Sequence, residues 1–174
     1  MFGSGTVLDS ARLKFTIGRR LNVDPRSVHA FVIGEHGDSE LAVWSSANVS
    51  GIRLDEYCAH CGYVSHEENR KKLENDVKNS AYEIIERKGA TYYGIAAATR
   101  RICESIVRDE HSILPVSTLA KGHYGLNDLY ISVPSLVGAR GVEDILDVNL
   151  SDEERAALEK SAAALKAVIA QINA

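Results

Sequence analysis

The chain has 174 residues, of which 45% are hydrophobic and 25% are charged, and its formal net charge at pH 7 is −4. This length suffices for one domain with its own hydrophobic core, and the acidic balance argues against a nucleic-acid partner. No apolar run approaches the roughly 20 residues of a membrane-spanning helix, and no basic-then-apolar leader opens the chain. We therefore expect a cytoplasmic protein without a membrane partner, and its three cysteines agree with a reducing compartment.

The first predicted element is a helix over residues 8–21, close to the N-terminus. Apolar side chains cover most of its circumference, whereas Asp9, Arg12 and Thr16 share the remaining stripe with two arginines. Such a helix is expected to be buried, with its polar stripe facing solvent or a site. No strand or polar leader precedes it, so we expect the chain to begin within a longer protein.

The middle of the chain predicts one strand and two helices. Residues 29–34, HAFVIG, form a short β-branched and aromatic run that indicates a buried strand. The apolar spacing from about Glu67 predicts a helix that ends at Gly89, a typical C-cap. Thr91 stands where an N-cap would begin the next helix, so the two helices are expected to meet at a break just before it.

Three extended runs follow, SILPVSTLA, LYISVPSLVG and VEDILDVNL, and they predict an antiparallel meander. A final helix opens with a capping box of Ser151 and Glu154. Strands and helices follow no regular βαβ order, so we predict the α+β class, with long helices packed on an antiparallel sheet. No glycine set matches G-x-G-x-x-G or a P-loop, so no Rossmann domain or nucleotide cradle is expected.

The segment VIGEHGDSE places His36 beside Glu35 and Asp38, directly after the predicted strand. Neighbouring anions raise the pKa of a histidine, so His36 could hold a proton near neutral pH and deliver it to a substrate. The alternative is a histidine that merely occupies a polar turn. Asp9 and Arg12 are three residues apart on one helix face, which suits an exposed ion pair. Alternatively, Asp9 orients a histidine while Arg12 binds a substrate carboxylate with its planar guanidinium.

Other motifs are less specific. Cys58 and Cys61 lie in CAHC, but no second pair of cysteines or histidines has zinc-like spacing, so we expect two partly buried thiols and no metal site. GDSEL lacks the last glycine of a G-x-S-x-G nucleophile elbow, which excludes that reading. Lys14 and His29 could bind an anion, although each alone is typical of a protein surface.

Several segments together resemble one family. GSGTVLDSARLKF, VHAFVIGEHGDSELAVWS, KGATYYGIA and the closing strands resemble the C-terminal, substrate-binding half of bacterial L-lactate dehydrogenases, within the lactate/malate dehydrogenase family. The likeness covers essentially the whole chain, and three motifs in the right order are more specific than any one of them. The malate enzymes share an Asp, an Arg and an HGD motif, whereas EHGDSELAVWS is typical of the lactate type.

The resemblance implies a role for each candidate residue in the NAD-dependent interconversion of pyruvate and lactate, a reaction of glycolysis and fermentation. It implies His36 as the proton donor and acceptor, Asp9 as its carboxylate partner and Arg12 as the clamp on the substrate carboxylate. It also implies Thr91 as a wall of the substrate pocket and Ser4 as a neighbour of the nicotinamide.

The same resemblance implies that residues 1–174 are a single domain, the C-terminal half of a two-domain dehydrogenase. The half that would carry the glycine-rich cofactor fold, a mobile-loop arginine and the residue that separates lactate from malate is absent, so the chain alone is expected to be inactive. Malate-type specificity therefore stays open. A non-catalytic fragment that only self-associates is a further alternative, because the family forms homotetramers.

An allosteric site is also implied by the resemblance. Bacterial relatives often bind fructose 1,6-bisphosphate between subunits through basic residues that align with Lys14 and His29. Arginine is usual where this chain has Lys14, which is a departure from the family pattern.

Overall fold

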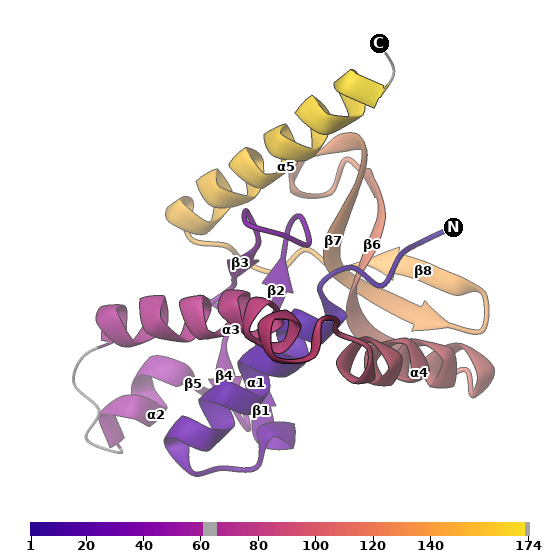
Figure 1. Cartoon of the computed structure of the whole chain (residues 1–174). Helices are drawn as coiled ribbons and strands as arrows, with labels where there is room; N and C mark the ends of the chain where they lie inside the picture. The colour runs from indigo at the N-terminus through magenta and orange to yellow at the C-terminus, as the bar shows by residue number, and fades with distance from the viewer. Residues whose placement is uncertain (61–65, 173–174) are drawn as a thin grey trace.

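The computed structural model describes residues 1–60 and 66–172. Its α-helices are α1 (Val7–Leu21), α2 (Leu54–His60), α3 (His66–Lys88), α4 (Tyr93–Val107) and α5 (Asp152–Ile172). Its strands are β1 (Val28–His29), β2 (Val32–Ile33), β3 (Leu41–Ala42), β4 (Asn48–Val49), β5 (Ile52–Arg53), β6 (Ser112–Lys121), β7 (Asn127–Gly138) and β8 (Gly141–Ile145). In Figure 1, α1 to α4 lie in the lower half of the view and α5 crosses its top.

The predicted meander is confirmed as an antiparallel sheet in the order β6-β7-β8. Its third run leaves the sheet after Ile145 instead of continuing to Leu150. Two helices pack against different parts of the central strand β7. Val133 belongs to a buried cluster that includes residues of α5, and Val137 belongs to one that includes residues of α4. Every described strand pairing is antiparallel, which agrees with the predicted α+β class.

The single strand predicted for residues 29–34 is wrong, because this segment forms two short strands in different sheets. β1 pairs with β4, and β2 pairs with β3. Two hydroxyls at the start of α1 bind Val32 of β2: that of Thr6, the N-cap residue, donates to the Val32 carbonyl at 2.6 Å, and that of Ser10 accepts from the Val32 N–H at 2.8 Å. Helix hydroxyls thus bind backbone groups that a neighbouring strand would otherwise pair.

The predicted first helix is confirmed, and α1 is held against the main sheet by the residues before it. Gly3 forms an antiparallel bridge with Ser117 of β6. Gly5 has φ +52°, and a Cβ on it would lie 2.5 Å from the backbone nitrogen of Ser117, so only glycine fits this approach. Leu13 and Ile17 are fully buried, which fixes the polar stripe of α1 relative to the core.

The predicted break between two helices is confirmed at Gly89, which has φ +78° and donates its N–H to Ile85 at 2.7 Å. The predicted N-cap at Thr91 is wrong, because α4 begins at Tyr93 and Tyr92 occupies the cap position without a side-chain hydrogen bond. Thr91 instead lines a cavity described below.

The capping box of the final helix is confirmed: the Ser151 N–H donates to Glu154 Oε2 at 2.9 Å, and the Glu154 N–H donates to Ser151 Oγ at 3.2 Å. Only the first half of α5 is docked, since Leu158 is 2% exposed and Ile169 is 42% exposed. No helix within the described ranges is long and apolar enough to cross a membrane.

We expect Leu158→Ala to destabilise the chain by about 2–5 kcal/mol, because it removes a fully buried side chain between α5 and the sheet. Ile169→Ala on the exposed part of the same helix should change the free energy of unfolding by no more than about 0.5 kcal/mol. Urea unfolding of both variants measures the difference. Equal losses would contradict the docking of α5 through Leu158.

Candidate active site

His36 lies in the loop of residues 34–40, which connects β2 to β3. Its Nδ1 atom is 2.8 Å from Asp9 Oδ2, and Arg12 Nη1 donates to Asp9 Oδ1 at 3.1 Å. Asp9 and Arg12 lie about one turn apart on α1, so they share one face of the helix. One carboxylate therefore contacts both the histidine and the guanidinium.

The Asp9 side chain is only 3% exposed, whereas that of His36 is 57% exposed. An exposed Asp9–Arg12 pair, the simpler sequence interpretation, is therefore wrong. Asp9 Oδ2 has no well-aligned hydrogen bond among the described residues, so its 2.8 Å contact with His36 Nδ1 acts mainly through charge. The Asp9 contact raises the pKa of His36 and outweighs the opposing effect of partial burial. Because a raised pKa favours the imidazolium, His36 can hold a proton to higher pH than an ordinary histidine.

A second carboxylate, that of Glu40, was not singled out from the sequence. Its side chain is 5% exposed, and its Oε2 is 4.0 Å from His36 Nδ1. Burial, followed by repulsion from Asp9, raises the pKa of Glu40 to about 7. The sequence signal that could have identified Glu40 is its position four residues after His36 and directly before the apolar run of residues 41–43. Atoms of Asp9, His36 and Glu40 lie within 4.8 Å of one another and could also hold a cation, but Arg12 already brings a positive charge to Asp9.

A cavity of about 310 Å³ opens beside these groups. Asp9, Arg12, His36 and Thr91 all line it, so the structure brings together four of the residues singled out from the sequence. The other lining residues come from the loop and from α3: Gly37, Asp38, Glu40, Lys78, Ala81, Tyr82 and Ile85.

Two side chains of α3 hold the loop that carries His36. Lys78 Nζ donates to the carbonyl of Asp38 at 3.2 Å, and Tyr82 Oη donates to the Asp38 carboxylate at 3.3 Å. Lys78 and Tyr82 are four residues apart, so both project from one face of the helix. The wall of the cavity and the support of the loop are therefore parts of the same helix.

Ser161 of α5 supports the same loop from another direction. Its Oγ accepts from the Glu35 N–H at 2.8 Å and lies 3.1 Å from Ser39 Oγ. Gly34, with φ +97°, is required at this contact, because a Cβ on it would lie 2.7 Å from Ser161 Oγ. A helix more than 120 residues away along the chain thus fixes the path of the backbone next to His36.

Ser4 is not among the residues that line this cavity. It is partly buried in the segment that precedes α1, where its carbonyl accepts from the Val7 N–H at 3.3 Å.

Lys14 and His29 line a separate cavity of about 350 Å³ together with Phe31. Lys14 Nζ lies 5.9 Å from the centre of the Phe31 ring, and burial lowers the pKa of Lys14. The structure therefore brings the two basic residues to one depression, away from His36.

Cys58 lies on α2 and is partly buried. Cys61, the other cysteine of CAHC, lies outside the residues that the structure describes.

Comparison with known proteins gives the family. The model of the lactate/malate dehydrogenase, alpha/beta C-terminal domain, matches residues 6–174. The chain belongs to the lactate/malate dehydrogenase family. This C-terminal domain is 51% identical over 173 residues to an L-lactate dehydrogenase of Acetivibrio thermocellus and 52% identical over 173 residues to one of Thermoanaerobacterium saccharolyticum.

The same domain superposes on a crystal structure of the minor L-lactate dehydrogenase from Enterococcus mundtii in its ligands-bound form, with a TM-score of 0.93 and 44% identity. That match covers 98% of this chain and 54% of the other. The matches to the two curated relatives include 99% of this chain but only 55% and 56% of the relatives' own length. The chain thus spans about half the length of the relatives it matches and corresponds to their C-terminal part.

We expect Ser161→Ala to destabilise the chain by about 1–3 kcal/mol, because the Glu35 N–H would lose its partner next to the His36 loop. The matched control is Ser46→Ala, since Ser46 Oγ is buried and has no hydrogen-bond partner among the described residues. That control should leave the free energy of unfolding unchanged or slightly higher. Urea unfolding measures both, and a Ser161→Ala variant as stable as the control would contradict the supporting role.

Proposed function

We propose that residues 1–174 form the C-terminal, catalytic domain of a two-domain, NAD-dependent L-lactate dehydrogenase that interconverts pyruvate and L-lactate. The observation that carries the proposal is the buried carboxylate of Asp9, within 2.8 Å of His36 and 3.1 Å of Arg12 at the edge of a cavity. The names of the relatives support the choice of lactate. A cytoplasmic homotetramer is part of the same proposal, by analogy with the family.

His36 is proposed as the proton donor for pyruvate reduction. Hydride transfer to the carbonyl carbon of a 2-oxo acid leaves negative charge on the oxygen, and a proton from the imidazolium removes that charge as it forms. Because Asp9 faces Nδ1, Nε2 is the nitrogen left for the substrate. Asp9 also stabilises the positive ring during the reaction. In the reverse direction, neutral His36 accepts the hydroxyl proton of lactate.

Arg12 is proposed to bind the substrate carboxylate. Among the described residues it donates one hydrogen bond, to Asp9, so its other N–H groups remain for a ligand in the cavity. A guanidinium can bind a carboxylate through two parallel bonds, which fixes orientation as well as position. Thr91 lines the same cavity and is proposed as one of its walls.

NAD supplies the hydride when it is bound. The chain has no G-x-G-x-x-G motif, so its residues do not fit the main cofactor site, and Ser4 is proposed only as a neighbour of the nicotinamide. The dinucleotide is therefore proposed to be held mainly by a domain outside these residues.

We expect the purified 174-residue chain to oxidise no NADH with pyruvate, and the chain joined to the cofactor-binding half of the Acetivibrio thermocellus relative to do so. Within the joined enzyme, His36→Gln should lower turnover by about 100- to 10,000-fold, because it removes the proton donor. His111→Gln, at an exposed histidine outside the cavity, is the matched control and should keep full activity. The measurement is the loss of NADH absorbance.

Appreciable turnover by the isolated chain would contradict the two-domain proposal. A folded joined enzyme that forms oligomers without activity would favour the alternative of a self-associating, non-catalytic domain. That alternative draws support from large apolar side chains exposed on the last turns of α5, including Ile169 and Ile172. Replacing pyruvate by oxaloacetate in the same assay tests malate-type specificity.

Lys14 and His29 are proposed to bind fructose 1,6-bisphosphate as an allosteric effector. Both line one cavity, and a lysine and a histidine can pair with phosphate oxygens. Lys14 supplies a point charge where a bidentate guanidinium is usual in the family, so a weaker phosphate contact is expected.

Titration of the joined enzyme with fructose 1,6-bisphosphate is expected to lower its KM for pyruvate, and Lys14→Ala should abolish that response because it removes a cation from the cavity. Lys72→Ala, at an exposed lysine of α3, is the matched control and should retain the response. Pyruvate saturation curves with and without the sugar bisphosphate measure the effect. Curves that do not move would remove this proposal and leave the catalytic one intact.

A further inference from the structure

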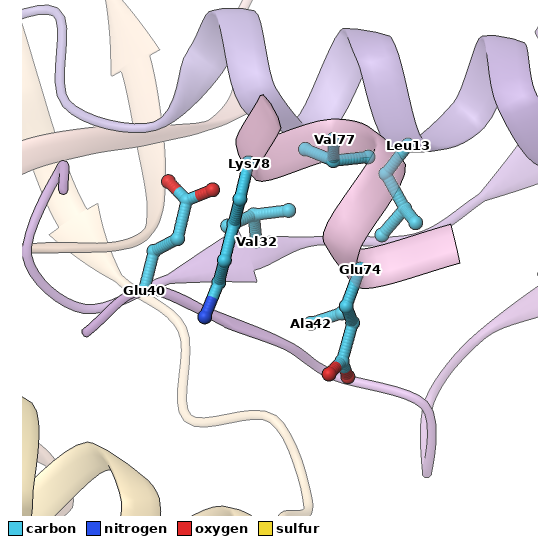
Figure 2. A pocket seen from close by; sticks show the side chains of 7 residues that line it. All are labelled: Leu13, Val32, Glu40, Ala42, Glu74, Val77 and Lys78. Atoms are coloured by element: carbon cyan, nitrogen blue, oxygen red, sulfur yellow. The ribbon is translucent and has the colours of Figure 1, made fainter. Parts of the chain in front are cut away.

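Glu40 is a buried charged residue that the proposed mechanism does not use. It lies directly before β3, and its side chain is 5% exposed, close to the 3% of Asp9. Figure 2 shows its carboxylate beside the side chain of Lys78, at the edge of a small cavity between α1, α3 and the strands. Glu40 and Lys78 also line the larger cavity with His36, so the two cavities adjoin at this carboxylate.

The groups that face Glu40 come from three parts of the fold. Asp9 and Arg12 face it from α1, His36 from its own loop, and Lys78 from α3. Glu74, also on α3, lines the small cavity but binds the indole N–H of Trp44.

Within the described residues nothing donates a hydrogen bond to the Glu40 carboxylate, although His36 Nδ1 lies 4.0 Å away. A buried carboxylate without hydrogen bonds is costly to ionise unless a positive charge lies close to it. Protonated His36 supplies such a charge. The reverse also holds, because an ionised Glu40 stabilises the protonated ring.

We propose that Glu40 is a positioning residue of the His36 site, whose carboxylate shares with Asp9 the stabilisation of the protonated imidazole. The proposal deepens the proposed function, since it rests on His36 as the proton donor. Asp9 contacts the ring directly and Glu40 acts at longer range, so the protonation of Glu40 and that of His36 are linked rather than independent.

The pH dependence follows from the direction of each effect. The pKa of Glu40 is raised to about 7, so Glu40 becomes ionised as the pH rises through neutrality. Its negative charge then raises the pKa of His36, in the same direction as the Asp9 contact. The added stabilisation of the imidazolium is therefore greatest above pH 7, where an ordinary histidine would have lost its proton.

The test is an NMR pH titration of the His36 ring in the 174-residue chain. Glu40→Gln, which keeps the shape and removes the charge, is expected to shift the midpoint of the His36 titration to lower pH. Glu74→Gln is the matched control: it removes a carboxylate on the same small cavity and keeps an acceptor for Trp44, so the midpoint should not move. An unmoved midpoint in Glu40→Gln, or equal shifts in both variants, would overturn the proposal.

A second titration follows Glu40 itself, in the unsubstituted chain and in His36→Gln, so it does not depend on how a Glu40 variant folds. The carboxyl carbon of Glu40 is expected to titrate near pH 7, and His36→Gln should move that midpoint higher, because a neutral side chain replaces a nearby cation. A Glu40 midpoint that His36→Gln leaves unmoved would overturn the proposal, because the two groups would then not interact. Neither titration involves turnover, so their failure is distinguishable from failure of the dehydrogenase proposal.

Discussion

The buried carboxylate of Asp9 is the constraint on which the site depends. Removing a carboxylate from water is costly, and the cost is acceptable only where opposite charges or donors replace the water. Arg12 lies 3.1 Å from one oxygen of Asp9 and His36 lies 2.8 Å from the other, so each oxygen faces one positively charged or chargeable group. The positions of the guanidinium and the imidazole are therefore set by the same buried charge.

Four separate parts of the chain form and support the site around that charge. α1 supplies Asp9 and Arg12, and Gly5 lets the segment before α1 lie against β6. The loop that carries His36 is held by α3 on one side and by Ser161 of α5 on the other. None of these elements forms the site alone, because each one contributes either a side chain of the site or the support for another element.

Much of the fold could be predicted from the sequence because its signals are local. The apolar spacing of the long helices, the glycine at the end of α3 and the capping box of Ser151 and Glu154 each depend on residues within a few positions of one another. The strand predicted for residues 29–34 failed because its parts have different partners: β1 pairs with β4, β2 pairs with β3, and Val32 also binds the hydroxyls of Thr6 and Ser10, more than 20 residues away. Local patterns contain no information on such partners.

The site, like the fold, could be predicted from the sequence only in part. Asp9, Arg12 and His36 could be selected from residue type and family resemblance, and all three line one cavity. Within VIGEHGDSE, however, the sequence pointed to Glu35 and Asp38 as the carboxylates near His36. The buried carboxylate of this segment that lies near the His36 ring is that of Glu40. Which of several neighbouring carboxylates turns inward is decided by packing against α1 and α3, and the sequence alone does not state that packing.

The contact between Glu35 and Ser161 spans 126 positions of the chain. During synthesis, the loop with His36 leaves the ribosome long before Ser161 has been added. The backbone beside His36 therefore lacks its α5 partner until Ser161 has been added, and until then, of these two helices, only α3 can hold that loop. A chain interrupted before α5 would therefore contain Asp9, Arg12 and His36 but lack the Ser161 contact that supports the loop of His36.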